Sequence, residues 1–171
     1  MAKKGTQPGA AKANGSVKKL RKLMKNVGVG MLTTVARDGR LHSRPMMTSA
    51  VEFDGDLWFI ARSTSGLADE IGQNPHVNVA YANPKGDRYV SVSGTASLVR
   101  DGAKLKELWS GKHKAWFPEG KKDPDLALLK VDVQGAEYWD ATNDAVQLAQ
   151  FVKPQPQAPQ PEDGTGAGAQ G

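Results

Sequence analysis

Hydrophobic and polar residues alternate most regularly in the segment Tyr89–Ala96. Alternation with a period of two is typical of a β-strand with one buried and one solvated face. The hydroxyl-bearing side chains of Tyr89, Ser91 and Ser93 fall on one face of this strand, and the intervening valines fall on the other. A face rich in hydroxyl groups has two interpretations: the lining of a small-molecule site, or the solvated side of an ordinary barrel strand.

Short strands and a few helices are predicted along the rest of the chain. Two Asp-Gly turns, at residues 38–39 and 54–55, predict hairpins, and hairpins join antiparallel strands. An antiparallel sheet of this size often closes into a small barrel, which removes its exposed edges. The predicted strands are residues 29–36, 41–49, 57–61, 77–81, 88–99, 126–133 and 136–140, and the predicted helices are residues 16–26, 65–73, 101–109 and 142–152.

Both ends of the chain lack a periodic apolar face. Residues 1–15 are rich in Lys, Gly and Ala, and residues 154–171 are rich in Pro, Gln and Gly. Such segments bury too little apolar surface to offset their loss of conformational entropy, so we expect both to be disordered. One globular domain is therefore predicted over residues 16–153.

Positive charge is concentrated at the N-terminal end. The net charge is +5, but eight of the 23 Lys and Arg residues lie in residues 1–25, which hold no Asp or Glu, so the remainder has 15 basic and 18 acidic residues. The basic arm is either a solvated tail or a weak, nonspecific contact for phosphates, and nucleic acid is not expected on the acidic body. The chain has no cysteine and no long apolar run, which favours a cytoplasmic protein without a membrane partner.

No catalytic or metal-binding motif is present. The three histidines are scattered, and neither a Gly-x-Ser-x-Gly elbow nor a Walker loop occurs. The candidate chemistry is instead that of ligand binding. Pro45 cannot donate to a strand ladder, so Arg44 should lie beside a sheet edge or gap with free backbone groups. Ser63–Ser65 lead from a strand into a helix, where they either cap the helix or help to bind a phosphate.

Seven segments resemble, in order and spacing, the pyridoxamine 5′-phosphate oxidase-like flavin proteins, and more narrowly their general stress protein 26-like branch. The resemblance covers about residues 17–141. The segments are Ser43–Met46, Leu57–Phe59, Asp69–Ile71, Val77–Tyr81, Tyr89–Ala96, Lys114–Gly120 and Ala136–Trp139.

This resemblance implies a mainly β (α+β) fold, an antiparallel six- to seven-stranded split β-barrel flanked by helices. It also implies a homodimer that holds FMN at the subunit interface. By position, residues of one subunit would contact the ring, the ribityl chain and the phosphate, and Tyr89, Ser91 and Trp139 would also lie close to the flavin, the first two reaching it from the partner subunit. The implied contacts of the first subunit are Arg44, Pro45, Met46, Ile60, Ala61, Arg62, Ser65, Gly66 and Leu67.

Two departures from the family pattern bear on cofactor and substrate. Leu67 stands where the family usually has a phosphate-binding lysine, which predicts weaker FMN binding or a preference for FAD or a deazaflavin, unless Arg62 substitutes for the missing cation. The segment after Trp139 lacks the Arg and His residues of true pyridoxamine phosphate oxidases, so we expect no such activity.

The function predicted from the resemblance is therefore a flavin-binding, stress-related redox protein, in which the flavin supplies the electron chemistry. Whether it is a flavin- or deazaflavin-dependent oxidoreductase is left open. Two alternatives remain: a non-catalytic protein that sequesters flavin or another small molecule, and a weak nucleic-acid binder that uses the basic arm.

Overall fold

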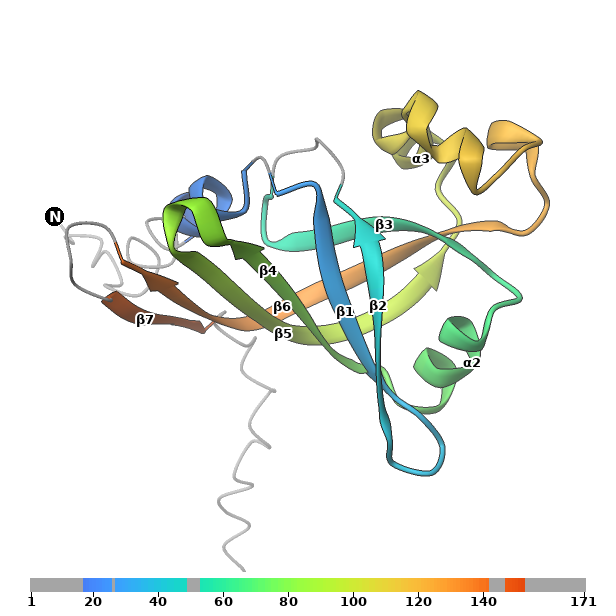
Figure 1. Ribbon diagram of the computed structural model, residues 1–171. Helices are drawn as coiled ribbons and strands as arrows, with labels where there is room; N and C mark the ends of the chain where they lie inside the picture. Colours follow the sequence, from blue (N-terminus) through green and yellow to red (C-terminus); the bar gives the residue numbers. More distant parts are fainter. Residues whose placement is uncertain (1–16, 26, 49–52, 142–146, 153–171) are drawn as a thin grey trace, which may run out of the picture.

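A computed structural model describes residues 17–25, 27–48, 53–141 and 147–152. Within these residues, seven strands form one antiparallel sheet in the order β2-β1-β4-β5-β6-β3, and β7 pairs with β6 on the same edge as β3 (Figure 1). The sheet curls until its end strands β2 and β3 come into contact, which makes it a split barrel as predicted. The strands are β1 (Val29–Val35), β2 (Leu41–Met47), β3 (Asp56–Arg62), β4 (His76–Asn83), β5 (Arg88–Val99), β6 (Leu126–Asp140) and β7 (Gln147–Val152).

Helices flank the barrel where the sequence predicts them. Residues 17–24 are helical, and α2 (Gly66–Gln73) and α3 (Gly102–Leu108) follow β3 and β5. Ser65 caps α2 by accepting a hydrogen bond from the Ala68 amide, and Asp101 caps α3 through two amides at 2.9 Å. No helix in the described part of the chain is long and apolar enough to cross a membrane. Short 3-10 turns follow β4 and α3: η1 (Pro84–Gly86), η2 (Gly111–Ala115) and η3 (Gly120–Lys122).

The predicted hairpin at residues 38–39 and the strand predicted over residues 88–99 are confirmed. β1 and β2 pair along their whole length across a turn in which Gly39 has φ 83°, a conformation that favours glycine. β5 spans the predicted residues, with Val90 and Val92 buried and Tyr89 exposed. The alternation therefore gave the correct orientation of both faces.

Three predictions about connections are wrong. β3 does not form a hairpin with β2, because it pairs with β6 along its whole length. The two strands predicted over residues 126–133 and 136–140 are one continuous strand, and its register with β5 shifts at Gly94. The predicted final helix is a strand over Gln147–Val152, and its proposed caps lie outside the described residues, as do the two predicted disordered ends.

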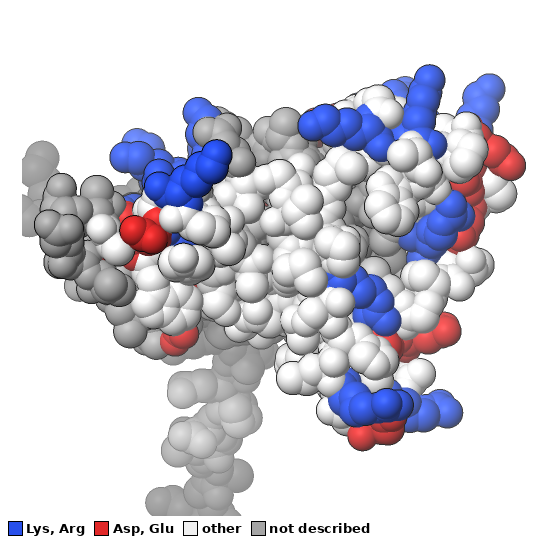
Figure 2. Space-filling view, viewed as in Figure 1, with Lys and Arg blue, Asp and Glu red and all other residues white. Residues whose placement is uncertain are grey.

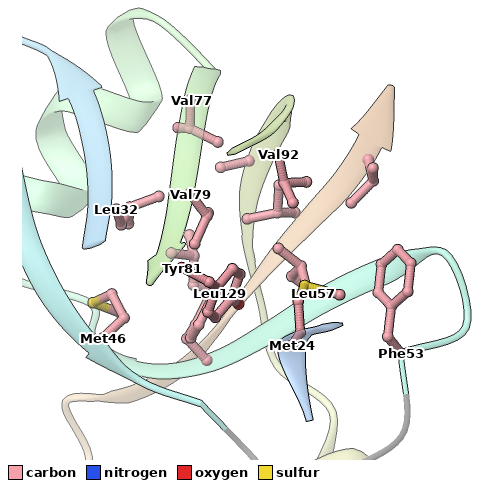
Figure 3. Close-up of a cluster of buried hydrophobic side chains, with 14 of the residues drawn as sticks. Met24, Leu32, Met46, Phe53, Leu57, Val77, Val79, Tyr81, Val92 and Leu129 are labelled. Atoms are coloured by element: carbon pink, nitrogen blue, oxygen red, sulfur yellow. The ribbon is translucent and has the colours of Figure 1, made fainter. Parts of the chain in front are cut away.

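One hydrophobic core fills the barrel. Side chains from β1 to β6 meet there with those of α2 and of the helical segment 17–24 (Figure 3). Burial of each large apolar side chain contributes roughly 1.5–3 kcal/mol, so this core is the main stabilising term. The residues labelled in Figure 3 are Met24, Leu32, Met46, Phe53, Leu57, Val77, Val79, Tyr81, Val92 and Leu129.

The sheet has an inner face toward this core and an outer face. Arg44 belongs to an inner row, because its neighbours across the sheet, Leu32, Val79 and Val92, are all 0% exposed. The adjacent row points outward and comprises Pro45, Met31, Ala80 and Ser91. Residues next to each other in sequence thus serve opposite faces.

Candidate functional site

A polar cluster joins β1 and β2 to α2 at the seam of the barrel. The Arg44 guanidinium donates to both carboxylate oxygens of Glu70, from Nη1 at 2.7 Å and from Nη2 at 3.1 Å. His42 Nδ1 lies 2.6 Å from the same carboxylate, and the Thr34 hydroxyl donates to it at 2.6 Å. Arg44 also donates to Thr34 at 2.8 Å. The predicted ligand residue Arg44 is therefore held in a fixed orientation by the protein itself.

Glu70 carries the negative charge of this cluster. The side chain is 12% exposed, and the side chain of Arg44 is 31% exposed. The Arg44 hydrogen bonds, with further ones from Thr34 and His42, lower the pKa of Glu70 to about 2 against the opposing effect of burial. Glu70 was not among the predicted site residues. Its position three residues after Leu67 and one before Ile71, which are both buried, places it on the inward side of α2 and was the available signal.

The end of β3 and the start of α2 form the second part of the site. Ala61 points into the core and is 6% exposed, whereas its neighbour Ile60 lies on the other face of the strand and is half-buried. Arg62 turns toward the segment after α3: it donates to the Trp116 carbonyl and to Asp125 at 3.3 Å, and lies 4.9 Å from the Phe117 ring centroid. Two guanidinium nitrogens of Arg62, Nη1 and Nη2, thus donate to protein acceptors, while the side chain is 45% exposed.

The Asp125 side chain is hydrogen-bonded to the turn at Ser63–Ser65, which the sequence predicts either to cap α2 or to bind a phosphate. Its carboxylate accepts hydrogen bonds from the Ser63 hydroxyl at 2.9 Å and the Thr64 amide at 2.8 Å. Hydrogen bonds from Thr64 and Ser63, together with Arg62, lower the pKa of Asp125 to about 2, so the group is anionic at neutral pH. No sequence signal pointed to Asp125, which lies 62 positions from Ser63.

Some predicted contact residues are part of the core rather than of an accessible surface. Met46 is 8% exposed and Leu67 is 6% exposed, and both belong to the main hydrophobic cluster. Gly66, between Ser65 and Leu67, is the first residue of α2, and nothing lies within 4 Å of the position of an added Cβ there. The helix start is therefore open at Gly66 and closed by packing at Leu67.

Tyr89, Ser91 and Trp139 lie on the outer face, on β5 and β6. Tyr89 is paired directly with Trp139 across the two strands, and its side chain is 40% exposed. The Asn78 amide donates to the Ser91 hydroxyl at 2.7 Å. The structure thus places two predicted aromatic contacts side by side on the outer face of the sheet.

The predicted residues form two groups on opposite faces of the sheet. The first group, around Arg44 and the start of α2, faces the seam, and the second, around Tyr89, faces outward. Large apolar side chains surround the second group, with Val29 50% and Met31 41% exposed. Figure 2 shows the middle of the molecule in this view largely free of charged side chains, with Lys and Arg gathered around its edges.

Three further aromatic residues lie in the segment after β5. Phe117 is 4% exposed and contacts Trp109, which also packs against His113. Trp116 is 66% exposed and caps the C-terminal end of η2, outside the strands that carry Tyr89 and Trp139. The structure therefore assigns Phe117 to packing and leaves Trp116 on the surface.

Comparison with known proteins identifies one family. The model of the family described as pyridoxamine 5′-phosphate oxidase like matches residues 15–161. Protein bli-3 of Neurospora crassa is 32% identical over 125 residues, which make up 68% of this chain and 60% of that protein. The chain thus spans about 60% of the length of this curated relative.

Solved structures show the same fold. The general stress FMN/FAD binding protein from Xanthomonas citri is 30% identical with a TM-score of 0.64, over 84% of this chain and 99% of that chain. General Stress Protein 26 from Bacillus anthracis is 24% identical with a TM-score of 0.67, over 80% of this chain and 98% of that chain. These matches confirm the resemblance and the fold class inferred from the sequence.

Proposed function

The chain belongs to the pyridoxamine 5′-phosphate oxidase-like family, and we propose that it is a flavin-binding protein with a redox role in the response to stress. The observation that carries the proposal is the 30% identity, over nearly the whole of the other chain, to a protein described as a general stress FMN/FAD binding protein. The side-by-side placement of Tyr89, which is exposed, and Trp139, which is half-buried, adds support, because aromatic side chains can stack on a planar ring.

The site is proposed to be completed by a second copy of the chain. Arg44 and Tyr89 lie on opposite faces of one sheet, so a single flavin can contact both only if they come from different subunits. The outer face offers an apolar surface for such a dimer, since it carries Val29, Met31 and Ala80 next to Tyr89. Covering this surface by a second subunit would bury side chains that one subunit leaves exposed.

The two ends of a flavin do not fit this chain equally well. The ring end has Tyr89, Trp139 and the fixed Arg44 guanidinium, and a bound flavin would supply the electron-transfer chemistry there. The phosphate end has no lysine at position 67 and has Asp125 at the turn. The chain's residues would therefore orient the ring more firmly than the phosphate.

Pyridoxamine phosphate oxidation is not part of the proposal. Asp140, directly after Trp139, is 6% exposed and forms an ion pair with Lys19 at 2.6 Å. A buried carboxylate at this position offers no cation to a substrate phosphate. An assay for pyridoxal phosphate formed from pyridoxamine phosphate under oxygen tests this exclusion, and steady formation would contradict it.

A fluorescence titration tests the flavin proposal. Adding the purified protein to FMN should quench flavin fluorescence and saturate at one flavin per chain, because an aromatic side chain stacked on the ring provides a quenching contact. Tyr89→Ala should weaken binding about three- to tenfold, whereas Tyr89→Phe, which keeps the ring, should bind like the natural chain. The absence of quenching and of any flavin retained through gel filtration would contradict the proposal.

A further inference from the structure

The turn between β3 and α2 is already occupied by an anion of the protein itself. The family resemblance places the flavin phosphate at Ser65, Gly66 and Leu67, at the end of this turn. In the structure, the neighbouring Ser63 hydroxyl and Thr64 amide both donate to the Asp125 carboxylate, at 2.9 and 2.8 Å. These are donors of the kind that binds a phosphate, and their hydrogens are committed to Asp125.

The side chains of Ser65 and Arg62 are also engaged. The Ser65 hydroxyl donates to the Arg62 carbonyl at 2.8 Å and accepts from the Ala68 amide, so its single hydrogen is used. The Arg62 guanidinium contacts Asp125, the Trp116 carbonyl and the Phe117 ring. Arg62 therefore neutralises Asp125 rather than replacing the missing lysine.

The local charge is unfavourable for a phosphate. Leu67 is buried and carries no charge, and Asp69 adds a second carboxylate in the first turn of α2. Residues 62–69 together with Asp125 thus carry one guanidinium and two carboxylates, and Arg62 is ion-paired with Asp125. A phosphate bound at the start of α2 would meet this net negative charge without a lysine at position 67 to attract it.

The free end of α2 is the remaining attraction for a phosphate. A helix N-terminus favours an anion by about two- to fivefold in affinity, and Asp69 already provides a negative charge there. A charge-assisted contact from a lysine or arginine would contribute about 10- to 100-fold. The helix end alone is therefore too weak to give strong selection for a phosphate.

We infer that this chain does not recognise the phosphate of its flavin, and that it selects the ring and ribityl chain shared by riboflavin and FMN. Asp125 is the residue that sets this specificity, because its negative charge opposes a phosphate and pairs with Arg62, and its carboxylate also occupies the donors of the turn. The inference rests on the proposed flavin function and concerns the end of the ligand that the proposed function leaves open.

Isothermal titration of the full-length protein with riboflavin and with FMN, in the same buffer and at constant ionic strength, tests the inference. The two dissociation constants should differ by less than about tenfold, because a single charge-assisted phosphate contact would already contribute that factor. The comparison uses the natural chain, so it does not depend on whether a variant folds.

Asp125→Asn provides the second measurement. Asn keeps an oxygen acceptor for Ser63 and Thr64 but removes the charge, so FMN binding should strengthen relative to riboflavin by about tenfold. Glu119→Gln removes one charge from an exposed position and should leave the ratio unchanged. Circular dichroism of both variants checks that the fold is retained.

The outcomes separate this inference from the proposed function. If FMN binds more than about tenfold more tightly than riboflavin, the phosphate is recognised and the inference is wrong, while the flavin proposal stands. An unchanged ratio in a folded Asp125→Asn variant removes Asp125 from the explanation and also contradicts the inference. If neither flavin binds, the proposed function itself fails, and the inference fails with it.

Discussion

At the scale of single residues, Glu70 fixes the positions of polar side chains in the candidate site. It accepts hydrogen bonds from side chains on two neighbouring strands. Arg44 and His42 reach it from β2, and Thr34, which is 0% exposed, reaches it from β1. A buried acceptor shared in this way leaves several donors without partners if it is removed. The orientation of the Arg44 guanidinium should therefore depend on the Glu70 charge.

Glu70→Gln should destabilise the protein by about 1–3 kcal/mol at pH 7, which is the range for hydrogen bonds to charged groups. The glutamine keeps one acceptor oxygen but cannot hold both arms of Arg44 and His42 together. Urea unfolding followed by circular dichroism measures the loss. Glu119→Gln, at an exposed position, is the matched control and should change the free energy of unfolding by less than about 0.5 kcal/mol.

The loss should also depend on pH. The folded-state pKa of Glu70 is about 2, below the ordinary value of 4.5, so its charge contributes stability fully above about pH 4.5 and loses this contribution as the pH falls toward 2. The difference in unfolding free energy between the natural chain and Glu70→Gln should therefore shrink between pH 4.5 and pH 2. A difference that stays constant over that window would show that the Glu70 charge is not responsible.

Individual site residues differed in how far the sequence could reveal them. A carboxylate at position 70, on the same side of a helix as Leu67 and Ile71, is a local signal that an inward-facing charge needs a partner. Asp125 gave no such signal, because its partners Ser63 and Thr64 lie on the far side of α2, β4, β5 and α3 in sequence. Side chains that meet only through tertiary folding leave no periodic trace in the sequence.

At the scale of elements, local sequence patterns predicted some of the strands and turns. The other strands depend on pairing with distant segments. β5 and the β1–β2 hairpin followed from alternation and an Asp-Gly turn. The sequence predicts a helix at β7, because a short apolar run fits both the helical and the strand period. Pairing with the second half of β6 makes this segment a strand. The β3–β6 pairing likewise joins strands about 70 positions apart, and no turn motif in the sequence predicts such a pairing.

The pairing of β5 with β6 depends on the absence of a side chain at Gly94. It lies where the register of β5 against β6 shifts, and an added Cβ would overlap the backbone oxygen of Asp132. Gly94→Ala should therefore cost more than about 2 kcal/mol, since backbone cannot yield as a flexible side chain can. Thermal unfolding measures this loss.

Gly72→Ala is the matched control for this substitution. Gly72 lies in α2 with nothing within 4 Å of an added Cβ, so the change should be neutral or stabilising by about 0.5–1 kcal/mol. Equal effects of the two substitutions would contradict the role assigned to close packing at Gly94.

At the scale of the whole molecule, the sequence supplied the candidate site residues but not the faces they share. The resemblance brought Arg44 and Tyr89 to one ligand, whereas the register of four strands places them on opposite sides of the sheet. The sheet curls until β2 and β3 are in contact at the seam (Figure 1), and the strand registers place some candidate contacts, such as Arg44, on the inner face and others, such as Tyr89, on the outer face. The proposed dimer follows from that separation.

Mixing two defective variants tests whether each site is shared between subunits. Arg44→Lys keeps a cation opposite Glu70 but loses the planar fork, and Tyr89→Ala removes the outer aromatic, so each should bind flavin weakly alone. After unfolding and refolding together, half of the dimers should be mixed, and each mixed dimer would combine an intact Arg44 with an intact Tyr89 at one of its two sites. Roughly a quarter of all sites should then regain the affinity of the natural chain, measured as tight flavin retained on a desalting column. Recovery of no tight sites, from variants shown by sedimentation to form mixed dimers, would mean that each subunit binds flavin with its own residues alone.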